Sequence, residues 1–156
     1  MSVNESLQYA FIHSKGAPVK VGEALVIQCD SIAIRAGIVT VRLFGVANGT
    51  QGACLKTDKG HIELSDGSKT RKVNIWHEPS LPSLVQHKVE CRTGKLKLWN
   101  IYRVHHPTTV TEDQWTGNAG MVLISQTAES RKYKCSDGVG PFDPSDFEFE
   151  VQWSET

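Results

Sequence analysis

The sequence lacks any long apolar run, and its amino terminus lacks the features of a signal peptide. A membrane span needs about 20 consecutive apolar residues, and no segment of the 156-residue chain approaches that length. The stretch Met1–Leu7 has no positively charged start followed by an apolar run. We therefore expect no membrane span. We expect the protein to be cytoplasmic, or exported by a route that leaves no amino-terminal signal peptide.

An excess of positive charge is also missing. The 17 Lys and Arg residues balance 17 Asp and Glu residues, which gives a formal net charge of zero. Proteins that bind nucleic acids neutralise phosphates with clustered Lys and Arg, and no such block stands in the sequence. The composition therefore argues against nucleic acid as a partner.

The cysteine spacing excludes the usual zinc motifs. Cys29, Cys54, Cys91 and Cys135 are spread widely and never form a Cys-x-x-Cys pair. Three of them end apolar or alternating runs, which is typical of small buried side chains. We expect free, buried thiols; the alternative of one or two disulfides would require an oxidising compartment.

Signatures of catalysis are absent as well. The sequence has no Gly-x-Ser-x-Gly elbow, no His-Glu-x-x-His and no phosphate-cradling glycine loop. His105 and His106 are adjacent, but neighbours in a strand point to opposite faces. We expect no enzymatic activity; the enzyme alternative would require both histidines to converge with a carboxylate such as Glu112 or Asp113.

Short runs rich in Val, Ile, Leu and aromatic residues recur along the chain, without the 3.6-residue stripe of an amphipathic helix. We interpret ten of them as strands bounded by Gly, Pro, Asn and Asp. They span Leu7–His13, Ala24–Cys29, Ile38–Val46, His61–Leu64, Arg71–Trp76, Leu84–Cys91, Lys95–Arg103, Met121–Gln126, Arg131–Cys135 and Asp146–Trp153. This pattern predicts one all-β domain over residues 1–156, an antiparallel β-sandwich such as a jelly roll with about ten short strands; a barrel is the alternative.

The connections between these runs carry turn signals. Arg92-Thr93-Gly94 should close a hairpin with Gly94 at positive φ. The longest polar stretch, from His105 to Asn118, is predicted to be an exposed loop.

An acidic loop precedes the last run. Asp137, Asp143 and Asp146 lie within ten positions, beside glycines that let backbone carbonyls converge. Calcium binds six to eight such oxygens, so these three residues are candidate metal ligands. The alternative is that Asp and Ser only stabilise turns through bonds to their own backbone.

The order Ser-Asp-Gly, a spacer, Asp-x-x-Asp and an alternating Phe-x-Phe-x-Val strand resembles the last loop and strand of small bacterial calcium-dependent galactose-binding lectins. The resemblance implies a galactose-binding-like sandwich in which calcium binds sugar hydroxyls. It implies that Asp137 is the first ligand and Asp143 the second. Pro144 departs from the pattern, because a second adjacent carboxamide or carboxylate belongs there, and Asp146 replaces it only in part.

A second candidate site surrounds Trp115. This aromatic residue stands in a polar segment beside Asp113 and Asn118. An aromatic ring can stack on the apolar face of a sugar while short polar side chains bond its hydroxyls. The alternative is that Trp115 folds back as a lid on the core. Trp99, in a strand that is apolar on both faces, is expected in the core.

Together these features favour a non-enzymatic binding module that recognises carbohydrate through loops around Trp115 and Asp137–Asp146, assisted by calcium. The alternative is a protein–protein interaction or structural sandwich with no small-molecule ligand. The binding hypothesis requires the two loops to lie at the same end of the sandwich. The sequence leaves the oligomeric state open.

Overall fold

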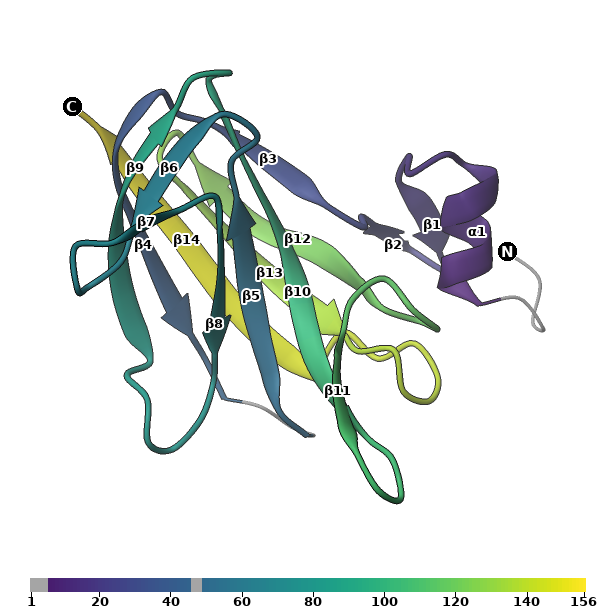
Figure 1. Cartoon of the computed structure of the whole chain (residues 1–156). Helices are drawn as coiled ribbons and strands as arrows, with labels where there is room; N and C mark the ends of the chain where they lie inside the picture. The colour runs from purple at the N-terminus through teal and green to yellow at the C-terminus, as the bar shows by residue number, and fades with distance from the viewer. Residues whose placement is uncertain (1–5, 46–48) are drawn as a thin grey trace.

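The computed structural model describes residues 6–45 and 49–156, which form two facing antiparallel sheets, a small hairpin and one helix (Figure 1). The larger sheet has seven strands in the order β12 (Gly120–Thr127), β13 (Ser130–Ser136), β14 (Phe147–Glu155), β4 (Ala36–Leu43), β9 (Leu84–Cys91), β6 (Gly60–Glu63) and β7 (Lys69–Thr70). The smaller sheet has five strands: β11 (Val110–Asp113), β10 (Lys95–His105), β5 (Gln51–Lys56) and β8 (Lys72–Trp76) in order, with β3 (Asp30–Ala33) also paired to β10. The prediction of an all-β antiparallel sandwich is confirmed.

Side chains from the inner faces of both sheets form the main core. In β14, Phe147, Phe149 and Val151 are 1%, 0% and 0% exposed, as the predicted alternation requires. Tyr133 stacks on Phe149 with ring centroids 5.0 Å apart. Trp153, the fourth member of this series, is only half-buried.

Nine of the ten predicted strands overlap with observed strands, and Leu84–Cys91 matches β9 residue for residue. The predicted run Ile38–Val46 overlaps β4, although Val46 lies outside the described residues. The described residues form fourteen strands rather than ten.

The tenth prediction, a strand over Leu7–His13, is wrong, as is the expectation that the chain has no helix. These residues form α1 (Leu7–His13). Ser6 caps its first turn by accepting a hydrogen bond from the Tyr9 backbone N–H at 3.3 Å. Leu7 and Phe11, four residues apart, are 0% and 2% exposed. That spacing places both side chains on one helical face.

Three of the strands that were not predicted, β3, β5 and β11, belong to the smaller sheet. In β5, small residues replace the usual branched ones, and a Cβ added at Gly52 would lie only 2.4 Å from the carbonyl oxygen of Ile75. In β11, polar residues pair with β10, for example Glu112 with Arg103. The predicted loop from His105 to Asn118 is therefore wrong over Val110–Asp113, because backbone pairing at a sheet edge needs no apolar side chain.

Local predictions about turns and cysteines hold with one exception. Gly94 has φ +78° in the turn between β9 and β10, as predicted. All four cysteines are free. Cys54, Cys91 and Cys135 are buried, but Cys29 is exposed.

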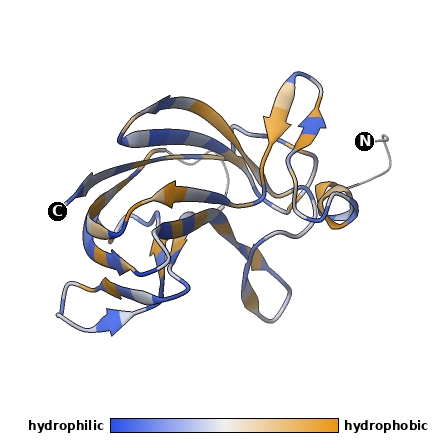
Figure 2. Cartoon of the chain, turned by 90° about the horizontal axis from the view of Figure 1, so that it is seen from above, coloured by the Kyte–Doolittle hydropathy of each residue, from blue (hydrophilic) through white to orange (hydrophobic). Residues whose placement is uncertain are grey.

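The amino-terminal elements form a second, smaller core beside the sandwich. There α1 packs near a hairpin of β1 (Val19–Val21) and β2 (Ala24–Val26), set apart from the sheets (Figure 2). Phe142 from the carboxy-terminal loop packs against this core. No helix among the described residues has the length and apolar character needed to cross a membrane.

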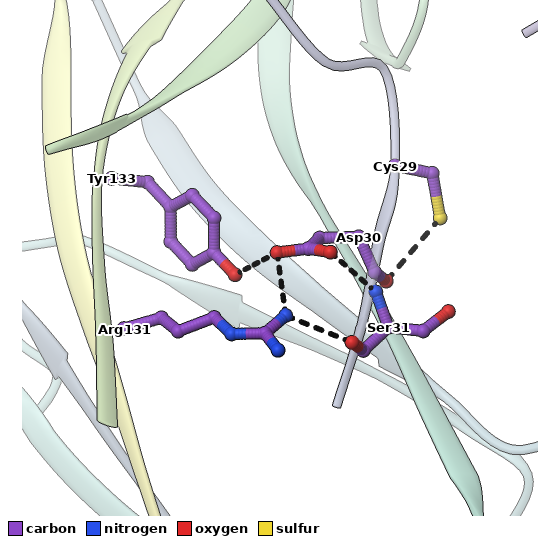
Figure 3. Close-up of polar contacts among 5 residues, drawn as sticks. All are labelled: Cys29, Asp30, Ser31, Arg131 and Tyr133. Carbon is purple, nitrogen blue, oxygen red and sulfur yellow. Dashed lines mark hydrogen bonds and ion pairs between the residues drawn. The ribbon is translucent and has the colours of Figure 1, made fainter. Parts of the chain in front are cut away.

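A polar cluster joins the two sheets along one side of the sandwich (Figure 3). Asp30 of β3 accepts hydrogen bonds from Arg131 Nη1 at 2.9 Å and from the Tyr133 hydroxyl at 2.5 Å. Arg131 also donates to the backbone carbonyl of Ser31 at 2.9 Å. Burial, together with the bond to Asp30, raises the pKa of Tyr133, so its hydroxyl stays protonated as a donor.

Candidate ligand-binding site

The two loops singled out in the sequence lie at the same end of the sandwich and touch each other. Asn118 Nδ2 donates to the carbonyl oxygen of Gly140 at 2.9 Å, and its Oδ1 accepts from the Leu7 backbone N–H at 3.1 Å. A Cβ added at Gly117 would lie 2.2 Å from the Gly138 carbonyl oxygen. The arrangement that the binding hypothesis requires is present, with Asn118 joining both loops to the start of α1.

The acidic loop is stabilised by its own carboxylates. Asp137, 4% exposed, accepts hydrogen bonds from Gln51 Nε2 at 2.8 Å and from the Val139 backbone N–H at 2.9 Å. Asp146, 7% exposed, accepts from the Asp137 backbone N–H at 3.2 Å. Desolvation is the main cause of the raised pKa of Asp146.

Asp143 has a different environment. Its Oδ1 accepts hydrogen bonds from the Ser145 hydroxyl at 2.6 Å and the Ser145 backbone N–H at 2.9 Å. These bonds lower the pKa of Asp143. The turn-stabilising alternative thus describes Asp137 and Asp143, each of which accepts from the backbone N–H two residues later, while Asp146 joins the two ends of the loop.

No group of three or more His, Cys, Asp or Glu side chains in the described part of the chain is placed to hold a metal ion. One oxygen of each carboxylate, Asp137 Oδ1, Asp143 Oδ1 and Asp146 Oδ2, accepts a hydrogen bond from a backbone N–H of the same loop. Calcium binding stays a prediction, and the loop has a structural role without it.

Trp115 packs against the main core. Its indole N–H donates to the carbonyl oxygen of Gln28 at 3.1 Å, and its backbone adopts φ +60°. Its ring centroid lies 5.0 Å from that of Trp99. Trp115 is therefore placed as a lid, and a direct contact with ligand stays a prediction.

This lid covers part of the outer face of the smaller sheet, the face that points away from the larger sheet. Cys54, Trp99 and Ile101 lie on that outer face but are 0%, 2% and 3% exposed. Gln114 fixes the lid, because its Oε1 accepts a hydrogen bond from Trp99 Nε1 at 2.7 Å. Trp99 is a core residue, as expected.

Beside the lid the outer face is hollowed. A depression of about 260 Å³ lies over β8 and β10 and is bounded by β11 and the residue after it. We call it the Trp76 cleft; its lining is Lys72, Asn74, Trp76, Ile101, Glu112, Asp113 and Gln114. Of the residues predicted to bind a ligand, Asp113 lines this cleft.

Arg103 holds one side of the cleft in place. Its guanidinium carbon lies 4.4 Å from the Trp76 ring centroid, a cation–π contact. Its Nη1 pairs with Glu78, and its Nε lies 3.6 Å from Glu112 Oε2. Asp113 accepts a hydrogen bond from the Thr111 hydroxyl at 3.1 Å. Arg103 thus contacts two carboxylates, and Glu112, Asp113 and Gln114 of the cleft each have a partner that holds the side chain in position.

The sequence reasoning missed Trp76, Asn74 and Lys72 as site residues. The signal was present, because Lys72, Asn74 and Trp76 alternate with the apolar Val73 and Ile75. That alternation identified a strand over these residues, but it does not show which other strands pair with this strand in the sheet. The pairing of Trp76 with Gly52 and of Gly52 with Ile101 creates the cleft.

Other parts of the surface contain fewer of the predicted site residues. A hollow of about 490 Å³ on the outer face of the larger sheet is lined mainly by hydroxyl and amide side chains: Ile38, Thr40, Thr127, Glu129, Ser130, Gln152, Trp153 and Ser154. It contains none of the predicted site residues. His105 is exposed and His106 hydrogen-bonds the Thr111 hydroxyl at 3.1 Å; neither lines the Trp76 cleft.

Comparison with protein-family models, curated proteins and solved structures finds no match to this chain in any of the three. The resemblance to galactose-binding lectins stays a prediction, and a function has to be argued from the site itself.

Proposed function

We propose that this protein is a non-catalytic binding module and that the Trp76 cleft binds a carbohydrate. One observation carries the proposal: a tryptophan side chain and several polar side chains line a single depression. Trp76, which is half-buried, supplies most of the apolar surface, since Ile101 is only 3% exposed. Asn74, Gln114 and Asp113 supply amide and carboxylate groups. A sugar ring has the complementary character, with apolar C–H faces and a rim of hydroxyls.

The size of the cleft and its place on an open sheet face favour a ligand that extends beyond the cleft. Its volume of about 260 Å³ is slightly below the roughly 300–1,000 Å³ of typical small-molecule pockets. One sugar residue would occupy the cleft, while further residues of an oligosaccharide continue along the open sheet face. Hydroxyls can donate to Glu112 and Asp113 and accept from the Asn74 amide.

Trp115 and Asn118 contribute indirectly to this proposal. Trp115 packs on Trp99, and the lid carries Gln114 into the cleft wall. Asn118 ties the end of the lid to the acidic loop. The acidic loop lies outside the cleft, so binding does not require calcium at Asp137, Asp143 or Asp146.

The first test is a glycan-array screen of the whole chain, run with millimolar calcium and again with a chelator. Asn74→Ala should weaken binding by roughly tenfold, because one amide that bonds the ligand is lost. The matched control is Gln152→Ala, which removes an exposed amide from the outer face of the larger sheet.

Several outcomes would overturn or refine the proposal. It fails if no glycan binds, or if Asn74→Ala and Trp76→Ala both bind as well as the wild type. Binding that the chelator abolishes would show that calcium assists. If Gln152→Ala loses binding instead, the ligand occupies the larger sheet.

A second candidate function, binding of a partner protein, is favoured by one observation. An apolar groove of about 550 Å³ runs between β2 and β12, and Leu25 in its wall is 57% exposed. Exposed apolar surface of this kind is typical of protein-binding sites. A Leu25→Ser variant that loses a partner in pull-down while keeping glycan binding would separate the two functions.

A further inference from the structure

Three lysines lie side by side next to the Trp76 cleft. Lys56 in β5 is the direct cross-strand partner of both Lys72 in β8 and Lys97 in β10. Directly opposed residues of antiparallel strands point to the same face, and neighbouring strands are about 4.8 Å apart. We call Lys72, Lys56 and Lys97 the lysine row; it lies on the outer face of the smaller sheet.

The lysine row is only partly neutralised. Lys97 Nζ lies 2.9 Å from Asp58 Oδ2. Among the described residues, neither Lys56 nor Lys72 has an Asp or Glu oxygen within 4.0 Å. Like charges placed directly opposite each other in a sheet destabilise it. The row therefore has a charge arrangement that folding alone does not favour.

The larger sheet has the ordinary arrangement in a comparable place. On its outer face Glu150 is the cross-strand partner of both Lys132 and Arg42. Signs alternate in that row, so each cation faces a carboxylate. The lysine row is thus not a general feature of this protein's surface.

Lys72 belongs to both the row and the cleft. It lines the cleft, and its Nζ lies 5.9 Å from the Trp99 ring centroid. At the opposite wall of the cleft stand Glu112 and Asp113, where Glu112 also faces Arg103. The cleft is therefore polarised: one wall is cationic, and the other offers carboxylates that accept hydroxyl protons.

We propose that the ligand of the Trp76 cleft is an acidic carbohydrate whose carboxylate or sulfate group lies against Lys56 and Lys72. This inference rests on the proposed function and specifies its ligand class. An anionic group at the row removes the lysine–lysine repulsion on binding, whereas a neutral sugar leaves it in place. The hydroxyls of the same sugar then meet Asn74, Glu112 and Asp113.

A nucleic acid fits this surface less well. Nucleic-acid binding gains its affinity from many phosphate contacts along a basic surface, and the chain has a formal net charge of zero. A phosphate backbone that continued through the cleft would be repelled by the carboxylates of Glu112 and Asp113. An acidic sugar carries its charge at one point and hydroxyls elsewhere.

The test uses the whole chain on an array that carries uronic-acid, sulfated and neutral oligosaccharides of matched backbones. Polyphosphate serves as a competitor without sugar. We expect binding to acidic glycans that weakens as sodium chloride is raised from about 50 to about 500 mM, because added salt screens exposed charges. Preference between the uronic and sulfated sets identifies which anionic group the row accepts.

Lys56→Gln and Lys72→Gln should each weaken binding to the acidic glycan by roughly tenfold, the loss expected for one charged hydrogen bond. Lys132→Gln, in the alternating row of the larger sheet, is the matched control and should bind as the wild type does. Thermal unfolding of each variant verifies that the fold is retained.

The outcomes separate this inference from the proposed function. If Asn74→Ala loses binding but both lysine variants bind normally, or if neutral glycans bind equally well, the carbohydrate site stands and the acidic ligand is overturned. If no glycan binds, both fail. If polyphosphate competes fully at equal charge concentration, the row is a general polyanion site and the inference is overturned.

Discussion

The outer faces of the two sheets have the same backbone geometry but different surroundings. On the larger sheet, β4 alternates between buried inward residues and more exposed outward residues. On the smaller sheet, residues 98–102 of β10 are all buried, and the lid around Trp115 covers the outward side chain of Trp99. A sheet face that carries both a lid and a row of like charges that is only partly neutralised is specialised, whereas the outer face of the larger sheet has charges of alternating sign.

The largest effect should come from truncating the covered face. Trp99→Ala should lower the free energy of unfolding by about 3–5 kcal/mol, as for a buried aromatic residue. Gln152→Ala, at an exposed position on the other sheet, should change it by less than about 0.5 kcal/mol. Urea denaturation measures both; similar values for the two variants would remove the distinction between the faces.

A smaller loss of stability is expected at Gly52, where there is no room for a side chain beside Trp76. Gly52→Ala should lower the free energy of unfolding by about 1–3 kcal/mol, because its Cβ would crowd the Ile75 carbonyl and the Trp76 ring. A Cβ added at Gly45 would meet no atom of the described residues within 4 Å, and the backbone there has no positive φ. Gly45→Ala should therefore be neutral or slightly stabilising in the same denaturation assay.

The cover over the smaller sheet also predicts a pH effect. Desolvation raises the pKa of the Cys54 thiol to about 12. The pKa of this thiol is higher in the folded than in the unfolded protein. Its contribution to stability is therefore complete at pH values below the unfolded-state pKa, and it is lost as the pH rises toward the folded-state pKa. Stability should therefore fall between about pH 9 and pH 12, by about 1 kcal/mol per pH unit for this thiol.

Cys54→Ala isolates this effect, since the slope of unfolding free energy against pH should become shallower without that thiol. Alkylation of the native protein gives a second measurement: Cys29, which is exposed, should react before the buried Cys54. Rapid native alkylation of Cys54 would mean that the lid leaves this face open.

The smallest effect concerns the two charge rows. Lys56→Gln should raise the free energy of unfolding by a few tenths of a kcal/mol, because it relieves repulsion from Lys72 and Lys97. Glu150→Gln should lower it by a similar amount, because Lys132 and Arg42 each lose an opposite charge. Opposite signs for the two variants, measured at low salt, support the comparison; equal signs contradict it.

The sequence predicted features that depend on neighbouring residues in the chain. Alternation identified β9 and the buried series of β14, and turn chemistry identified Gly94. It failed over Leu7–His13, where the spacing of Leu7 and Phe11 fits a short helix as well as a strand. It also missed β5, where Gly52 and Ala53 give no β-branched signal.

The candidate site was predictable only in part. Asp113 was identified from its place beside an aromatic residue in a polar segment, and it lines the Trp76 cleft. The lysine row could not be identified, because Lys56, Lys72 and Lys97 are far apart in the chain and meet only through strand register. The pattern of a strand shows which of its residues share a face, but not which residues of a strand distant in the chain lie opposite them.

The attachment of α1 has a consequence for the order in which the chain folds. The Leu7 backbone N–H bonds to Asn118, 111 positions later, and the Gln8 backbone N–H bonds to the Gly117 carbonyl at 2.8 Å. A helix of seven residues has little stability alone. The contacts that hold α1 in place therefore form only after the segment containing Gly117 and Asn118 has been synthesised, so α1 docks later than elements whose partners are nearby in the chain.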